Sequence, residues 1–174
     1  MTQKEQQERI AQMGSGTQPG PLGPDELAEL LSRPLVARVA SVGEDGYPHI
    51  TPMWHCWRDG AVWLVSRRQS LVAAHVLRQP RVCVSVANDD LPYTRTTIYG
   101  SAVIMNPGPP SPADWRSLVH EMAARYVGDR DSTYASRTED LPRWVIRVVP
   151  ERMTSWRGGG WPKAHERGVA DDNG

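Results

Sequence analysis

The chain has 174 residues, and its 20 basic residues balance its 20 acidic residues, so the formal net charge is zero. This length is sufficient for one domain with a buried core. A neutral chain lacks the broad positive field that attracts nucleic acid or anionic lipid, so we expect neither a nucleic-acid nor a membrane partner. No apolar run approaches the roughly 18 residues of a membrane span, and the first residues lack the apolar core of a signal peptide. We therefore expect a cytoplasmic protein whose anion sites are local.

The two ends of the chain differ in composition from the middle. Residues 1–23 are polar and then rich in glycine and proline, a composition that buries little apolar surface. The last residues are similarly polar. We predict a flexible arm over 1–23, one folded domain over 24–162 and a flexible tail over 163–174.

The first half of this domain predicts a short helix followed by three strands. Asp25 is a candidate N-cap for a helix with the sequence DELAELLSRP, which Pro34 ends. Residues 35–66 then contain three β-rich runs separated by the turn sequences GEDG and RDG. Tight turns between β-rich runs are typical of consecutive antiparallel strands, so these residues predict a meander.

The second half predicts two more helices and three more strands. The sequence SLVAAHVLRQP has apolar residues near helical spacing, and it is followed by strand-like runs at 81–89 and 96–105. A proline-rich connection precedes a helix from Pro112 to about Tyr126, and an alternating run over 143–156 predicts the last strand. The pattern favours a mainly β domain with short helices, in which five or six antiparallel strands form a small barrel.

A basic cluster lies where the third predicted strand ends and the next helix begins. It consists of Arg67, Arg68, Ser70 and Arg78. Free backbone N–H groups and the helix dipole favour an anion at such a junction, and the side chains add charge-assisted hydrogen bonds. A phosphate is the ligand that this chemistry predicts, and solvated arginines at a strand end are the alternative.

The segment HITPMWHCW combines ring-binding and polar residues on one strand. Alternation places Ile50, Pro52, Trp54 and Cys56 on the core face and the intervening residues on the other, more mixed face. Thr51, Met53 and the backbone beside Pro52 are then suited to line a flat ring system. The alternative for His49 and His55 is that both are ordinary hydrogen-bonded strand residues.

A third candidate is the segment SWRGGGWPK, which follows the last strand. Trp156 and Trp161 flank its three glycines, so the segment is suited to cover a planar ligand or to anchor a subunit contact. A plain structural tail is the alternative.

Other catalytic motifs are absent from the sequence. Cys56 and Cys83 lie in separate strand-like runs without a CxxC spacing, which indicates two free thiols. No histidine pair has metal-ligand spacing backed by a carboxylate, and there is neither a glycine-rich phosphate loop nor a GxSxG motif. Hydrolase and metalloenzyme chemistry therefore have no support.

Several segments resemble the pyridoxamine 5′-phosphate oxidase-like split β-barrel superfamily, and its flavin- and deazaflavin-dependent oxidoreductase branch in particular. They are ARVASVGEDGYPHITPMW, VWLVS, HVLRQPRVCVSV, YGSAVI and RYVGDRDSTYASRTEDLPRWVIRVVPERMTSW, between about Leu35 and Trp161. The combination of G-x-P-H-x-x-P with a later R-x-P-R-V carries the resemblance. It implies a six-stranded antiparallel split barrel that binds FMN or coenzyme F-420, as a homodimer with cofactor sites at the subunit interface.

The resemblance also implies roles for individual residues. Thr51, Pro52, Met53 and Trp54 would lie beside the ring of the cofactor, while Ser66, Arg67, Arg68 and Ser70 would hold its phosphate. Many relatives carry a lysine two residues after the position of Ser70, where this chain has Val72. Phosphate binding would then depend on the arginines, with Arg78 as a further candidate.

The activity that the resemblance implies is hydride transfer between the bound cofactor and a small organic substrate, with His55 or Tyr93 as the proton donor. We favour the deazaflavin coenzyme F-420 over FMN because PERMTSWRGGGW resembles relatives assigned to that coenzyme. One alternative is a haem-binding protein with His49, His55 or His75 as ligand. Another is a cofactor-binding module without turnover.

Overall fold

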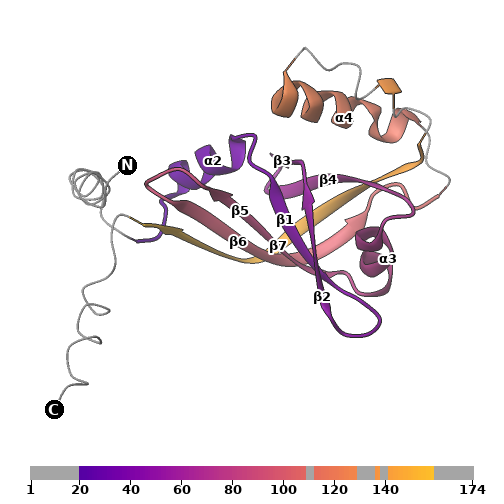
Figure 1. Ribbon diagram of the computed structural model, residues 1–174, viewed down its shortest axis with the longest axis horizontal. Coiled ribbons are helices and arrows are strands. Elements are labelled where there is room, and N and C mark those ends of the chain that lie inside the picture. Colours follow the sequence, from indigo (N-terminus) through magenta and orange to yellow (C-terminus); the bar gives the residue numbers. More distant parts are fainter. Residues whose placement is uncertain (1–19, 109–111, 129–135, 138–140, 159–174) are drawn as a thin grey trace, which may run out of the picture.

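The computed structural model describes residues 20–108, 112–128, 136–137 and 141–158. Within these ranges seven strands form one antiparallel sheet with the order β2-β1-β5-β6-β7-β4-β3 (Figure 1). The strands are β1 (Ala37–Val42), β2 (Pro48–Met53), β3 (His55–Arg58), β4 (Ala61–Arg67), β5 (Arg81–Asn88), β6 (Thr94–Ile104) and β7 (Arg143–Arg157). The helices are α2 (Pro24–Ser32), α3 (Leu71–Arg78) and α4 (Pro112–Val127). The domain is mainly β, as the sequence predicts.

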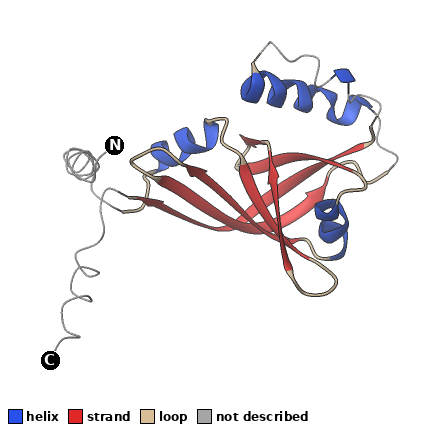
Figure 2. Cartoon of the chain, in the orientation of Figure 1, coloured by secondary structure: helices blue, strands red, loops and turns tan. Residues whose placement is uncertain are grey.

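The sheet curls into a half-barrel, and the positions of β2 and β3 show why. These strands follow each other in the chain with only Trp54 between them, yet they lie at opposite edges of the sheet. β2 pairs with β1, whereas β3 pairs with β4. The two edges must therefore approach each other at Trp54, which the strongly curved sheet in Figure 2 accomplishes.

The prediction of six strands is wrong by one for the same reason. The run from Pro48 to Arg58 reads as a single strand, but it changes partners at Trp54 and becomes two. The predicted faces are also wrong within β2, because Ile50 is 63% exposed and Pro52 is exposed, while Thr51 and Met53 are half-buried. A proline with no N–H is tolerated in β2 because this strand is an edge.

The core has two parts, one on each side of β4. Val62 and Leu64 of β4 belong to the main core, which fills the concave face of the sheet with residues of α2 and α3 such as Leu31 and Val72. Trp63 and Val65 point the other way and pack under α4. The second cluster contains Cys56, Trp115, Leu118, Val119, Met122 and Val145. This packing holds α4 against β3 and β4, next to the corner at Trp54 (Figure 1).

The helix termini follow from local sequence. α2 begins at Pro24 and not after Asp25, because Gly23 is its N-cap and the Gly23 N–H donates to the Glu26 carboxylate at 2.9 Å. α3 begins after Ser70, whose hydroxyl accepts a hydrogen bond from the Ala73 N–H at 3.2 Å. α3, α4 and β7 confirm the last two helices and the last strand that the sequence predicts.

Two global expectations concern thiols and membranes. Both cysteines are free thiols, Cys56 buried and Cys83 half-buried, as predicted. Among the described residues no helix is both long enough and apolar enough to cross a bilayer.

Candidate functional site

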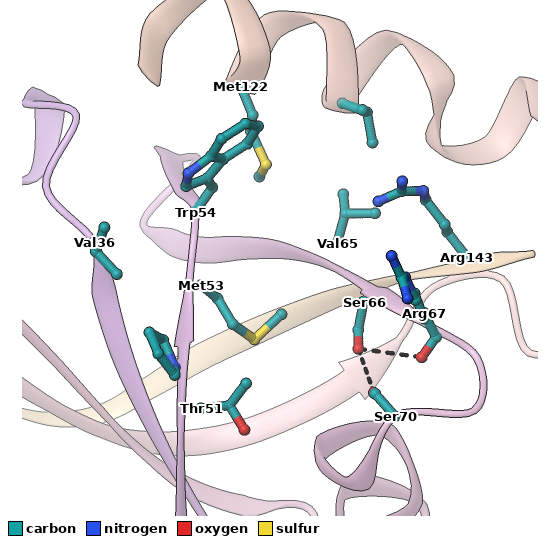
Figure 3. Close-up of a pocket in the computed structure, with 12 residues that line it drawn as sticks. Val36, Thr51, Met53, Trp54, Val65, Ser66, Arg67, Ser70, Met122 and Arg143 are labelled. Carbon is teal, nitrogen blue, oxygen red and sulfur yellow. Dashed lines mark hydrogen bonds between the residues drawn. The ribbon is translucent and has the colours of Figure 1, made fainter. Parts of the chain in front are cut away.

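A cavity of about 500 Å³ lies between β2, the end of β4, the start of α3 and one side of α4 (Figure 3). Its volume is within the range of roughly 300–1,000 Å³ that is usual for small-molecule sites. The residues predicted to bind a cofactor that line it are Thr51, Pro52, Met53, Trp54, Ser66, Arg67 and Ser70. The structure thus brings together the predicted ring wall and most of the predicted phosphate cluster in one cavity.

One end of the cavity is suited to an anion, and we call it the anion end. Arg67 at the end of β4 is directly opposite Arg143 at the start of β7 in the antiparallel register. Like charges directly opposite each other destabilise a sheet, and a bound anion removes that repulsion. The Arg67 guanidinium makes no hydrogen bond or ion pair with the other described residues. Arg143 is buried, with only 5% of its surface exposed. The Ser66 and Ser70 hydroxyls, hydrogen-bonded to each other, complete this end.

The other end of the cavity is apolar, and we call it the ring end. Its walls are Val36, Met53, Trp54 and Met122, which lie on the opposite side of the cavity from Arg67 in Figure 3. Thr51 adds a polar atom, because its Oγ1 is buried and has no hydrogen-bond partner among the described residues. An apolar wall with one oriented hydroxyl is the kind of surface that a flat heteroaromatic ring requires.

A side chain of α4 packs against the Trp54 indole. The indole stacks on the Tyr126 ring with the ring centroids 5.2 Å apart and the planes 15° from parallel. The Tyr126 hydroxyl donates to the Leu35 carbonyl at 2.7 Å and accepts from the His55 N–H at 3.1 Å. The same hydroxyl lies 2.8 Å from His55 Nδ1. The corner between β2 and β3 is therefore fixed by a side chain of α4.

His55 occupies this buried corner and does not line the cavity. Its side chain is fully buried, and desolvation by burial, followed by the nearby Arg125 charge, lowers its pKa from 6.5 to about 4. The imidazole is therefore neutral at neutral pH, and it contacts Tyr126 and not the cavity. This placement argues against the predicted role of His55 as a proton donor.

Two other predicted residues, Tyr93 and Trp156, lie away from the cavity. Tyr93 is half-exposed and directly precedes β6, where its carbonyl accepts from the Gly158 N–H at 2.8 Å. Trp156 is near the end of β7 opposite Arg95, whose guanidinium lies 5.5 Å from the centre of the indole. Trp161 is outside the described residues. The end of β7 and the ring wall are therefore separate regions of the chain.

The basic cluster is divided by the fold. Arg68 does not line the cavity, and its guanidinium lies 5.4 Å from the centre of the Trp144 ring. Arg78 donates to the carbonyls of Val42, at 2.8 Å, and Gly43, and so it fixes the turn between β1 and β2. Of the three predicted arginines, only Arg67 reaches the cavity.

Val72 stands where the resemblance leads us to expect a lysine, and the fold shows where its side chain lies. Val72 is 1% exposed and packs in the main core, so the side chain at this position does not reach the cavity. The second cation of the anion end is Arg143, which sequence reasoning missed. Val36, Val119 and Met122 were also missed, because they reach the cavity from segments distant in sequence. Val65, which directly precedes Ser66 in β4, was missed because an apolar strand residue carries no signal of a site.

The histidines considered as haem ligands do not line the cavity either. His75 Nδ1 lies 2.9 Å from the Ser41 hydroxyl, and the His49 and His75 rings contact each other edge to face with centroids 5.7 Å apart. In the parts of the chain that the structure describes, no group of three or more His, Cys, Asp and Glu side chains is arranged to hold a metal ion.

Comparison with known proteins identifies relatives of this fold. The family described as pyridoxamine 5′-phosphate oxidase matches residues 24–157, which is most of the chain. No curated protein matches the chain.

Solved structures give the same fold in proteins of different kinds. A conserved hypothetical protein of Mycobacterium tuberculosis is 26% identical with a TM-score of 0.65, and the match covers 78% of this chain and 85% of that one. An F-420 reductase is 25% identical with a TM-score of 0.60, over 77% of this chain and 98% of its own. HutZ, a haem storage protein of Vibrio cholerae, is 16% identical with a TM-score of 0.60, over 78% and 96%. The fold alone therefore does not select a cofactor.

Proposed function

The chain belongs to the pyridoxamine 5′-phosphate oxidase family, and from this premise we propose that it is a flavin- or deazaflavin-dependent oxidoreductase. It binds a coenzyme F-420-type or FMN cofactor in the 500 Å³ cavity and exchanges hydride with a small organic substrate. The observation that carries this proposal is the union, in one cavity, of an apolar ring wall and a pair of facing arginines. A phosphorylated tricyclic cofactor has the same two parts.

The residues present fit such a cofactor. Thr51, Met53 and Trp54 would hold its ring, and the buried Thr51 hydroxyl, which has no hydrogen-bond partner among the described residues, would be free to bond to it. Arg67, Arg143 and the Ser70 hydroxyl would hold its phosphate. The bound cofactor supplies the hydride chemistry, and the protein binds and orients it and excludes water from its ring.

The described cavity wall offers no side chain of the kinds that usually donate a proton to a reduced substrate. None of the described residues that line the cavity is a histidine, tyrosine, cysteine, aspartate or glutamate. In this proposal a water molecule or the substrate itself therefore takes the role of general acid at the described part of the wall.

Coenzyme F-420 is the preferred cofactor in this proposal. The similarity to an F-420 reductase, which covers 98% of that protein, supports it over FMN. Haem receives less support, because the relevant histidines contact other side chains and none of them is among the described residues that line the cavity.

The working unit in this proposal is a homodimer with a cofactor at each subunit contact. The convex face of the sheet carries a continuous row of side chains, in which Ile50, Ala40, Cys83 and Tyr99 are neighbours across four strands. Ile50 and Tyr99 are exposed large apolar side chains, which are costly to leave in water and typical of a subunit contact. A monomer by light scattering at micromolar concentration would contradict this part of the proposal.

Parallel titration of the purified protein with coenzyme F-420, FMN and haem tests the cofactor assignment. We expect micromolar or tighter binding of F-420, with a change in its absorbance and fluorescence, and weaker binding of FMN. Tight F-420 binding without reduction of any acceptor would indicate a binding module. Binding of haem alone, or of none of the three, would remove the redox assignment.

A further inference from the structure

The last turn of α4 carries two adjacent side chains, Arg125 and Tyr126, that contact three other segments of the chain. We propose that Tyr126 is a positioning residue that sets the shape of the ring end of the cavity without touching the ligand itself. The inference rests on the proposed function for its ligand, but the geometry that carries it belongs to the protein alone.

The hydroxyl of Tyr126 joins two backbone segments that both lead into the cavity. It bonds to Leu35, the residue before Val36, and to His55, the residue after Trp54. Val36 and Trp54 both line the cavity. Because the phenol has one proton and the Leu35 carbonyl accepts it, His55 Nδ1 is the donor in the third contact. One hydroxyl therefore fixes the neighbours of two wall residues at once.

The ring of Tyr126 acts on the same wall by packing. It stacks on the Trp54 indole and does not itself line the cavity, so it holds a wall residue without being part of the wall. Arg125 reinforces the arrangement, because its guanidinium donates to the Leu31 carbonyl at 3.1 Å and the Arg33 carbonyl at 2.7 Å. These bonds satisfy carbonyls at the C-terminal end of α2, which leads directly into Leu35.

The anion end is built from other elements. Arg67, Ser70 and Arg143 belong to β4, the N-cap of α3 and β7, and no hydrogen bond joins any of them to Arg125 or Tyr126 within the described residues. Loss of the Tyr126 contacts should therefore change the ring end selectively. A residue with only a general structural role would affect both ends.

The first test uses the protein without any cofactor. The indole N–H resonance of Trp54 is assigned by its disappearance in Trp54→Phe, and it is then compared in the wild type, Tyr126→Phe and Tyr126→Leu. We expect a shift in Tyr126→Phe, which loses the hydroxyl, and a larger shift or broadening in Tyr126→Leu, which also loses the stack. Tyr47→Phe is the control, because Tyr47 is 74% exposed on a turn. An unchanged Trp54 resonance in both Tyr126 variants would overturn the inference.

The second test compares the two ends in Tyr126→Phe, which retains the aromatic ring and should fold. We expect affinity for F-420 or FMN to fall about 3- to 10-fold, the cost of ordering on binding a wall side chain that Tyr126 no longer holds in place, while affinity for inorganic phosphate changes less than about 2-fold. Equal losses for both ligands would mean a general structural role and would overturn the inference. If the wild type binds neither cofactor, the proposed function fails, and the Trp54 resonance still decides whether Tyr126 positions the wall.

Discussion

The two ends of the cavity are built in different ways. At the anion end, Ser66, Arg67 and Ser70 lie within one short stretch where β4 passes into α3, and only Arg143 comes from elsewhere. At the ring end, Val36, Trp54 and Met122 come from three separate segments, and the buried contacts of Tyr126 hold the first two in place. The first end depends on charge that lies close together in sequence, and the second depends on packing.

This difference implies that the two ends respond to different perturbations. Arginine remains charged at any pH that a protein tolerates, so the anion end keeps its positive charge when the pH falls. At the ring end the buried neutral His55 contacts Tyr126, and protonation of this histidine at low pH would place a charge in the buried corner. The ring end is therefore sensitive to acid. Each of the following predictions acts on one end and leaves the other in place.

Acid should have the largest effect, and it should act on the ring end. The pKa of His55 is 6.5 in the unfolded chain and about 4 in the folded protein, so the unfolded state binds more protons between these values. The free energy of unfolding should therefore be highest above pH 6.5 and fall as the pH decreases towards 4, by up to about 3 kcal/mol.

Urea denaturation at pH 7.0, 5.5 and 4.5 measures this loss. Carboxylates add their own pH dependence, so the wild type must be compared with His55→Asn, whose side chain does not titrate. The difference between the two curves should shrink as the pH falls. A difference that is independent of pH would mean that His55 is protonated in the folded protein or that its charge costs little.

Removal of one arginine should have the next largest effect, and it should act on the anion end. Arg67→Ala should weaken binding of a phosphorylated cofactor by about 1.5–3 kcal/mol, the usual contribution of a hydrogen bond to a charged group. Arg68→Ala is the matched control, because this neighbouring arginine lies over Trp144 and outside the cavity. Isothermal titration calorimetry of both variants with the same cofactor measures the difference in affinity. Equal affinities would contradict the proposal that Arg67 binds the phosphate of the cofactor.

The same contrast explains what the sequence could predict. Arg67 and Ser70 were predicted because the strand-to-helix junction is a local pattern, and Ser66 was predicted from the family resemblance. Arg143 was missed because it meets Arg67 only through the pairing of β4 with β7, which no local pattern reports. The sequence also predicted Thr51 and Met53 as ring residues, but it did not predict that the strand changes partners at Trp54. The run of β-forming residues continues through Trp54 without a turn signal, and only the curl of the sheet divides it into two strands.

Contacts between segments distant in sequence also explain why some predicted site residues, such as His55 and Arg78, do not line the cavity. His55 reads as an accessible strand histidine, yet its partner Tyr126 is 71 positions away in the sequence and buries it. Arg78 reads as part of a basic cluster, yet its guanidinium binds carbonyls of the turn before β2. In both cases the residue type was informative and the tertiary partner decided its role.

The smallest predicted effect concerns the Thr51 hydroxyl at the ring end. Thr51→Val removes a buried hydroxyl that has no partner among the described residues, so the cofactor-free protein should be as stable as the wild type or more stable. If the cofactor ring accepts or donates a bond there, its affinity should fall by about 0.5–1.5 kcal/mol. Thr96→Val is the contrasting variant, because its buried hydroxyl donates to the Thr154 carbonyl at 3.1 Å, and its loss should destabilise the protein by about 1 kcal/mol. A stable Thr51→Val protein with weakened cofactor binding would mean that this hydroxyl serves the ligand and not the fold, whereas a destabilised one would place its partner within the chain.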